Sequence, residues 1–481
     1  MRVLVTGATG FVGRALVPAL QHEGHRVVVF ARSARRARAR LGADIEAVDA
    51  TEGADALTNA LQGCDAVINL AGEPIAGGRW TESRRTALRD SRVAATRGLV
   101  QAIARMAVKP RVLVSASAVG FYGNRGAEVL DERAQAGTGF LADLCVEWEA
   151  AALAARTLGL RVVLPRIGVV LGRDGGALGK MLPPFSFGLG GPMGSGEQFL
   201  PWIHLHDLVR LIVAALTDDR FDGPVNAVAP EAVTNREFAK TLGRALNRPA
   251  VVPIPSLALR LAMGDAASVV LDGQRVIPAL LTRIGFSFIY RDLASAFRDI
   301  VGGTDVTLST ITEPIDAHGS VIGREYLDRR RPIYELRTTT MVNAPLAETF
   351  EFFSKAENLG LITPSSMGFL ITKQPAAIAE NVQIDYKVRV NGLPINWRTR
   401  IVTWRPGERF VDFQEKGPYR AWWHEHAFFD RGDKTLMEDR VCYAPPMGPL
   451  GRMANAFFIK PVLRQIFRYR SDVIALRFGR G

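Results

Sequence analysis

The sequence predicts an α/β protein: a Rossmann doubly wound parallel sheet with a small substrate-facing subdomain, followed by an α+β domain. Three observations support this prediction. The chain opens on an apolar strand that runs into a glycine-rich turn, at residues 3–14. Apolar runs then alternate with helical patterns up to about residue 172, which is typical of a doubly wound sheet. Beyond residue 333, several strand patterns precede one long helical pattern, which is typical of an α+β domain.

The composition indicates a soluble protein of more than one domain. The 481 residues are 48% hydrophobic and 22% charged, with a formal net charge of +12. Three widely spaced cysteines without a CxxC motif predict neither disulfides nor a zinc site. A strand directly after Met1-Arg2 leaves no room for a signal peptide, and no apolar run approaches the ~18 residues of a membrane helix. We therefore expect a cytoplasmic protein without stable membrane insertion.

The charge distribution bears on partners. Basic residues are spread over both halves of the chain, which disfavours nucleic acid as a partner. A small-molecule substrate is the expected partner, and the sequence leaves a homodimer open.

The turn after the first strand is the first candidate site. Gly7 permits a tight turn, Gly10 lets the backbone approach a pyrophosphate, and Gly13 lets helix and strand pack closely. The following helix N-terminus favours an anion because its N–H groups are unpaired. A glycine-rich turn without a ligand is the alternative. The cofactor contacts expected here are Gly7, Thr9, Gly10, Phe11, Val12 and Gly13.

The second expected strand, over His25–Ser33, ends in a basic residue. In this fold an acidic residue about 20 positions beyond the glycines binds the ribose 2′-hydroxyl of NAD, whereas an Arg accommodates the 2′-phosphate of NADP. Arg32 stands there, so we expect NADP (as NADPH) in preference to NAD; a solvated helix start is the alternative. The contacts expected at this strand end are Ala31, Arg32 and Ser33. A third strand ends at Asp49, whose carboxylate could meet the adenine amino group.

Three more strands complete the predicted sheet, over Cys64–Gly72, Arg111–Ser117 and Leu160–Gly172. Small residues at the end of the first of these let a dinucleotide lie close to the backbone, which adds Leu70, Ala71 and Gly72 to the contacts. Ser115, on the next strand, could hydrogen-bond a carbonyl near the nicotinamide or cap the strand end. The Gly- and Pro-rich loop from Gly172 to Pro201 is long for a compact domain, which indicates a functional role or mobility. Thr234 and Glu237 predict a well-capped helix start.

Several motifs follow in order: Gly7–Gly13, Asn69–Gly72, Ser115–Gly123 and Pro201–Leu208. Together they resemble the extended, epimerase-like branch of the short-chain dehydrogenases/reductases. A second set is similar to an atypical subgroup commonly labelled NAD(P)-dependent epimerase: Phe140–Ala142 before Trp148–Ala151, Arg166–Gly172, Gly188–Pro192 and Gly285–Phe288. The resemblance covers residues 1–302 and implies an oxidoreductase or epimerase. It also implies cofactor contacts from Arg92, Arg166 and Val170.

The chain departs from this family at the catalytic residues. The family uses a Tyr four positions before a Lys that lowers the phenol pKa for proton exchange. No such pair occurs in this sequence, and the expected window reads Phe140–Cys145. Ser117 and Tyr122 are the catalytic candidates that remain; strand capping and packing are their alternative roles. His204 and Asp207 are candidates for substrate binding.

Apolar periodicity is weak over residues 303–332, which we expect to be a linker that ends in three arginines. Beyond it the pattern changes from alternating strands and helices to successive strands. Antiparallel strands are expected before a final helix over Leu450–Phe478. Their ranges are Tyr334–Val342, Gln383–Asn391, Ile395–Trp404, Phe410–Glu415, Ala421–Asp430 and Thr435–Tyr443. With Met341–Pro345 before Phe350, this order resembles the helix-grip superfamily of START-like and polyketide-cyclase-like (SRPBCC) domains, over 333–481. The resemblance implies an apolar ligand between sheet and helix.

Four tryptophans on the expected strands could line that cavity or belong to an ordinary core: Trp397, Trp404, Trp422 and Trp423. One buried face is expected on the final helix, from Phe457, Phe458, Val462, Leu463, Ile466 and Phe467. His424 and His426 alternate along a strand and are expected to lack further ligands nearby, so we expect no metal.

Three functions remain open from the sequence alone. The first is an NADP-dependent reductase or epimerase whose C-terminal domain captures an apolar substrate. The second is a catalytically silent NADP-binding sensor or scaffold coupled to that domain. The third is two independent activities on one chain. The absent Tyr–Lys pair favours the second, and the retained cofactor residues with an elaborated substrate loop favour the first.

Overall fold

The computed structural model describes the chain except residues 43–44, 54, 76–77, 174, 303–305, 312–313, 323–325, 327–332, 365–366, 374, 376, 391–392, 447 and 479–481. Two compact units are present, Met1–Gly302 and Gly303–Gly481. Within the described residues, helices with both the length and the apolar character for crossing a membrane are absent.

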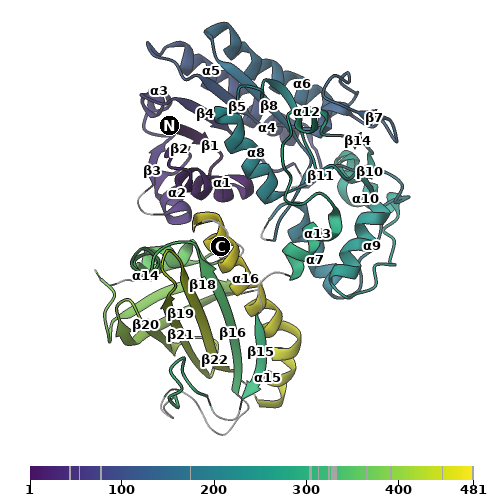
Figure 1. The fold of residues 1–481 in the computed structure, drawn as a ribbon. Helices are drawn as coiled ribbons and strands as arrows, with labels where there is room; N and C mark the ends of the chain where they lie inside the picture. The colour runs from purple at the N-terminus through teal and green to yellow at the C-terminus, as the bar shows by residue number, and fades with distance from the viewer. Residues whose placement is uncertain are drawn as a thin grey trace. The chain divides into compact units, whose positions relative to one another are not determined.

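The first unit is built on a parallel sheet with strand order β12-β8-β5-β4-β1-β2-β3 (Figure 1). Apolar β-branched residues fill its central strands, which suits strands buried on both faces. The predicted Rossmann-like sheet is confirmed, and β12 is a seventh strand that the sequence pattern did not indicate. The strands are β1 Arg2–Thr6, β2 Arg26–Ala31, β3 Glu46–Asp49, β4 Ala66–Asn69, β5 Val112–Ser115, β8 Arg161–Ile167 and β12 Gly223–Ala227, with β6 Ser117–Ala118 beside β8.

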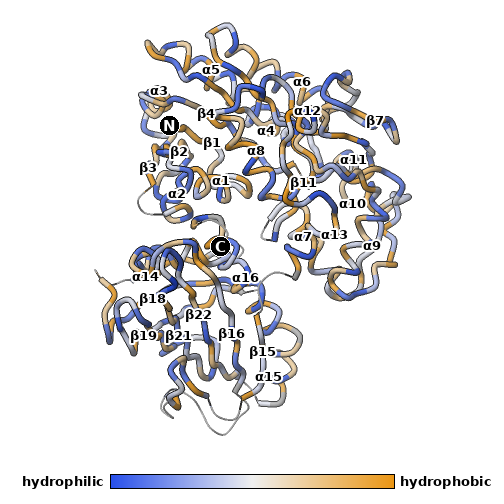
Figure 2. The backbone as a smooth tube through the Cα atoms, viewed as in Figure 1, coloured by the Kyte–Doolittle hydropathy of each residue, from blue (hydrophilic) through white to orange (hydrophobic). Residues whose placement is uncertain are grey.

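Helices cover both faces of this sheet. On one face α3, α5 and α6 bury a core that includes Leu4, Val67 and Leu113. On the other face α1 and α8 pack against each other (Figure 1). Figure 2 shows the central strands in the colours of apolar residues, whereas arginines alternate with apolar residues along α2. The helices are α1 Phe11–His22, α2 Ala34–Leu41, α3 Ala56–Leu61, α4 Glu82–Arg89, α5 Ala95–Ala104, α6 Phe140–Leu153 and α8 Leu205–Thr217.

A smaller part of the first unit lies beyond β8. Its core joins Trp202, Phe238 and Phe297. The expected cap of α9 is confirmed, because Thr234 and Glu237 form a capping box. The short strand pairs are β9 Val169–Leu171 with β11 Trp202–His204, β10 Phe199–Leu200 with β13 Val233–Thr234, and β7 Val129–Leu130 with β14 Arg275–Val276. The helices are α7 Gly176–Ser186, α9 Asn235–Ala245, α10 Ser256–Met263, α11 Ser268–Leu271, α12 Ala279–Arg283 and α13 Leu293–Phe297.

The second unit is mostly an antiparallel sheet with strand order β15-β16-β22-β21-β20-β19-β18-β17. Alternate residues of β21 face opposite sides: Trp422 joins one apolar cluster with Leu463 of α16, and Trp423 joins another with Ile322. The strands are β15 Thr307–Ile311, β16 Ile333–Val342, β17 Leu370–Lys373, β18 Gln383–Val390, β19 Leu393–Arg405, β20 Arg409–Lys416, β21 Ala421–Asp430 and β22 Thr435–Ala444; the helices are α14 Leu346–Phe353, α15 Gly448–Ala454 and α16 Lys460–Phe478.

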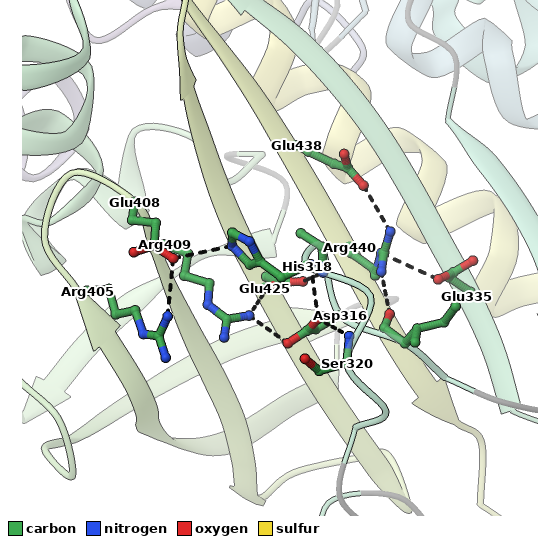
Figure 3. A network of polar contacts seen from close by, with 12 residues as sticks. Asp316, His318, Ser320, Glu335, Arg405, Glu408, Arg409, Glu425, Glu438 and Arg440 are labelled. Carbon is green, nitrogen blue, oxygen red and sulfur yellow. Dashed lines mark hydrogen bonds and ion pairs between the residues drawn. The ribbon is translucent and has the colours of Figure 1, made fainter.

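The expected linker over 303–332 is partly a folded element of the second unit. β15 pairs with β16, and Ile322 is buried. Arg409 holds the intervening segment by an ion pair to Asp316 at 2.7 Å, and its other partner is Glu425 at 2.8 Å (Figure 3). Weak apolar periodicity hid this segment because polar contacts fix much of it. The three arginines at 329–331 lie outside the described residues.

Candidate functional site

The glycine turn after β1 has a geometry that only glycine fits. Gly7 has φ +69°, and a Cβ there would overlap the carbonyl of Leu70. A Cβ at Gly13 would lie 2.5 Å from the Ala8 carbonyl oxygen, so the start of α1 depends on this glycine for its close approach to the turn. Gly10 caps α1 without a side chain, and the first turn of α1 carries no acidic group. The backbone N–H groups at this end are therefore suited to an anion.

The end of β2 presents Arg32, followed by Ser33. The Arg32 side chain is 92% exposed, and its Nη1 lies 3.4 Å from Glu73 Oε1. Ser33 caps α2 by accepting from the N–H of Arg36. Asp49 accepts a hydrogen bond from the N–H of Ala34 at 3.1 Å, and its bonds to Thr51 lower its pKa. Asp49 thus helps to fix the start of α2, directly beyond Arg32.

The segment after β4 packs against Arg92. The Arg92 guanidinium donates to the Glu73 carbonyl at 2.9 Å and lies 5.3 Å from the Trp148 ring. Burial lowers the pKa of Arg92. A Cβ at Gly72 would be 3.0 Å from the Arg92 guanidinium carbon, so this glycine makes room for the arginine.

Ser115 is fully buried in a polar network inside the sheet. Asn69 donates to Ser115 Oγ at 3.1 Å and to Thr96 Oγ1 at 2.9 Å, and Trp148 donates to Thr96 at 3.1 Å. The predicted cofactor contact is therefore occupied by hydrogen bonds between β4, β5 and α5.

Arg166 and Glu149 form a buried ion pair, with side chains 4% and 6% exposed. Two parallel hydrogen bonds of 2.8 and 2.9 Å join them. Ser117 donates to Glu149 at 2.6 Å, and Arg166 donates to the Tyr122 hydroxyl at 3.0 Å. The structure places Arg166 in this buried pair, and the cofactor contact that the family resemblance implies for it stays a prediction.

Tyr122 is fully buried, and its hydroxyl donates to Asn226 at 2.7 Å. Burial raises the pKa of its phenol. Tyr122 is not among the described residues that line the cavity of this unit. We therefore leave it out of the catalytic groups.

A cavity of about 610 Å³ lies beside Ser117, Arg92 and Trp148. Leu141 and Cys145, four residues apart on α6, both line it. Burial raises the pKa of the Cys145 thiol to about 12, so it is held as the neutral thiol. Neither tyrosine nor lysine occurs in the part of the lining that the structure describes.

The two candidates near β11 are packed into the structure. His204 is 2% exposed and lies 3.3 Å from Asp299, and its ring lies 3.8 Å from that of Tyr290. Asp207 accepts from the N–H groups of Ile289 and Tyr290 at 2.8 and 2.9 Å. Both side chains therefore tie the start of α8 to residues 289–299 of the first unit.

A second cavity, of about 360 Å³, lies in the second unit between the sheet and α16. Trp397, Trp422 and apolar residues of α16 line it. Trp404 and Trp423 belong to apolar clusters and are not in the described lining. The side chain of Phe457 lies outside the described residues.

One stretch of this cavity wall is polar: Asp412, His424, His426 and Arg470. Asp412 lies 3.1 Å from His424, and Asp439 lies 2.8 Å from His426. The expectation that the two histidines lack nearby ligands was wrong, because neighbouring strands supply both carboxylates. Burial raises the pKa of Asp412, but both imidazoles lower it, and the result is well below the usual range. The sequence did contain a signal for this cluster: Asp412 and Asp439 each stand at a position of β20 or β22 whose side chain faces the interior.

Comparisons with known proteins match the first unit. The family described as "NAD dependent epimerase/dehydratase family" matches residues 3–228, and "Domain of unknown function (DUF1731)" matches residues 254–300. An "Epimerase family protein SDR39U1 homolog, chloroplastic" of Arabidopsis thaliana is 43% identical over 63% of this chain and 87% of its own length. The human "Epimerase family protein SDR39U1" is 40% identical, over 63% of this chain and 100% of its own length.

Solved structures give the same fold for this part. The human SDR39U1 protein "with NADPH" has a TM-score of 0.58 and 38% identity, over 63% of this chain and 99% of that chain. A nucleoside-diphosphate sugar epimerase from Corynebacterium glutamicum has a TM-score of 0.51 and 33% identity, over 63% of this chain and 58% of that chain.

Proposed function

Because the chain belongs to the NAD dependent epimerase/dehydratase family, we propose that its first unit is an NADP(H)-dependent reductase or epimerase for a small-molecule substrate. The observation that carries the proposal is the turn at Gly7, Gly10 and Gly13. A Cβ at the first or last of these would strike backbone, and the cradle opens onto a helix N-terminus. When bound, the nicotinamide cofactor supplies hydride chemistry, and the protein supplies binding and orientation.

Arg32 supports the preference for NADP over NAD. Its exposed guanidinium stands at the end of β2, where an acidic residue would serve NAD. Asp49 is engaged with the N–H of Ala34. A related human protein with 38% identity was solved with NADPH. Arg32 and Ser33 would together receive the 2′-phosphate.

The cavity beside Ser117 is the proposed substrate site. The Ser117 hydroxyl points its proton at Glu149, so its oxygen lone pairs remain to orient a substrate hydroxyl. Arg85, Arg92 and Arg260 of the same described lining are positive groups available to an acidic or phosphorylated substrate. Leu141 and Cys145 occupy the helix face where the family's Tyr and Lys would act.

The second unit is proposed to be a helix-grip domain that binds an apolar ligand. Its antiparallel sheet and its final helix α16 enclose a cavity with mainly apolar walls. Burial of apolar surface drives binding in such a site. The ligand would be either the substrate of the first unit or a separate signal.

A second candidate function is a catalytically silent NADP-binding sensor. The described cavity lining of the first unit, which contains neither tyrosine nor lysine, favours it. Ser117 is then a structural partner of Glu149 alone.

Turnover separates the two candidates. The purified chain, loaded with NADPH in one series and with NADP⁺ in another, is mixed with a panel of carbonyl compounds and nucleotide sugars, and both the redox state of the cofactor and product stereochemistry are followed. The enzyme proposal expects turnover that Ser117→Ala slows without loss of NADPH binding. NADPH binding without turnover of any compound in the panel, and with no effect of Ser117→Ala, favours the sensor.

A further inference from the structure

Three donor side chains converge at one place in the cavity wall of the second unit. Asp412 stands on β20 directly opposite His424 of β21, and His426 follows on the same face of β21. Asp412 Oδ2 lies 3.1 Å from His424 Nδ1 and 3.3 Å from His426 Nε2. One ligand atom from each residue falls within 4.8 Å of the others.

These separations suit a small divalent ion. Zinc takes imidazole nitrogen and carboxylate oxygen at about 2.0–2.2 Å, and in a tetrahedral site two such ligands are about 3.4 Å apart. Asp412 keeps close to that separation from each histidine. Two of the three donor separations are therefore close to those of a four-coordinate ion, and the third lies within 4.8 Å.

The remaining imidazole nitrogens share one carboxylate. Asp439 Oδ1 is 3.2 Å from His424 Nε2 and 2.8 Å from His426 Nδ1. Metal-bound histidines usually donate their other N–H to a carboxylate, which fixes the tautomer and the ring orientation. Asp439 can serve both rings in this way, with Asp412 on their opposite nitrogens, when His426 carries its proton on Nδ1 and Arg470 Nη2 gives up its contact with that nitrogen.

Charge and burial also favour a cation. His424, His426 and Asp439 are 7%, 4% and 2% exposed. Arg470 lies 3.3 Å from Asp439, and its Nη2 lies 3.1 Å from His426 Nδ1. With neutral imidazoles, two carboxylates face this one guanidinium, so the cluster carries a net negative charge in a place where uncompensated charge is costly.

We propose that Asp412, His424 and His426 bind one divalent transition-metal ion of the Zn²⁺ class, with Asp439 as the carboxylate that orients both histidines. All three ligands line the cavity, which leaves a coordination position for an oxygen of the bound ligand. The site lies in the second unit and does not depend on the cofactor proposed for the first.

The test is a titration of the full chain, stripped of metal with a chelator and desalted, with Co²⁺ followed by visible absorption and with Zn²⁺ by competition. We expect one equivalent bound in a nitrogen- and oxygen-ligated site. Asp412→Asn and His424→Gln should abolish this binding, and Asp439→Asn should weaken it about 10–100-fold.

His206→Gln is the matched control, because His204, His206 and Asp299 form another group of potential ligands, in the first unit. It should leave the Co²⁺ spectrum and affinity unchanged. A wild-type chain that binds neither Co²⁺ nor Zn²⁺ overturns the proposal whatever the variants do, and so does binding that survives Asp412→Asn and His424→Gln but is lost in His206→Gln. NADPH titration of the same samples reports on the first unit independently.

Discussion

Breaking the Arg166–Glu149 pair should destabilise the first unit more than any surface ion pair would. In Glu149→Gln the new amide nitrogen faces the Arg166 guanidinium, so one of two parallel hydrogen bonds becomes a contact between donors. Arg166 is then left as a buried charge without its counter-ion. Arg166→Met leaves the Glu149 carboxylate with Ser117 as its remaining partner.

The expected magnitude follows from burial. Both side chains are at most 6% exposed, and removal of one partner from a buried pair costs about 3–5 kcal/mol. That corresponds to a roughly 10²–10⁴-fold rise in the opening equilibrium. The double variant Glu149→Gln/Arg166→Met removes both charges and should cost little more than either single variant, because the two changes are coupled.

Hydrogen-exchange mass spectrometry measures this on the full chain, since peptides from α6 and β8 report on the first unit alone. Glu128→Gln is the matched control, because it removes the same kind of Glu–Arg ion pair at the surface. Glu128 is 52% exposed and pairs with Arg125, so its loss should leave hydrogen-exchange protection unchanged. Costs that add in the double variant, or single variants that match Glu128→Gln, would refute the assignment of Arg166 to a structural pair.

Three further predictions concern cofactor, turn and ligand. Arg32→Ala should weaken NADPH binding about 10–100-fold, because an exposed charge-assisted contact with the 2′-phosphate is lost, and should leave NADH binding and the unfolding transition unchanged. An equal loss of affinity for both cofactors in fluorescence titration argues against the 2′-phosphate role. Gly13→Ala should abolish NADPH binding because it forces a Cβ against Ala8. Gly98→Ala on α5, where there is open space for a Cβ, should leave binding unchanged. Unchanged NADPH binding by Gly13→Ala would contradict the proposal that the glycine turn holds the cofactor. Ile384→Trp should fill part of the cavity of the second unit and so block binding of an apolar fluorescent probe, at a stability cost of about 1–3 kcal/mol. Undiminished probe binding would show that the probe does not bind in this cavity.

Local sequence patterns predicted the framework well. β1, the glycine turn and α1 follow one another directly in the sequence, so the patterns for strand, turn and helix support the same prediction. The antiparallel strands β18 to β22 also follow from alternation along the chain. β12 and β15 were missed because Gly223, Pro224 and Asn226 interrupt the apolar pattern of β12, and β15 is mainly threonine and serine. Pairing with β8 and β16 holds these two strands in place.

Contacts between distant segments explain what the sequence did not predict at the sites. The resemblance implied a cofactor contact for Arg166, but its buried ion pair with Glu149 of α6 is visible only in the structure. The two histidines of β21 looked isolated in sequence, and only the sheet register brings Asp412 and Asp439 beside them. A one-dimensional pattern contains neither the pairing of strands nor the burial that decides which charges must meet.

Direct titration of the purified chain with NADPH and with NADH, followed by cofactor fluorescence, tests the central claim. We expect saturable binding of one NADPH per chain, with NADH binding more weakly. Failure of both cofactors to bind a folded chain would contradict the proposed dinucleotide site, and the cavity of the second unit would then be the place to look for function.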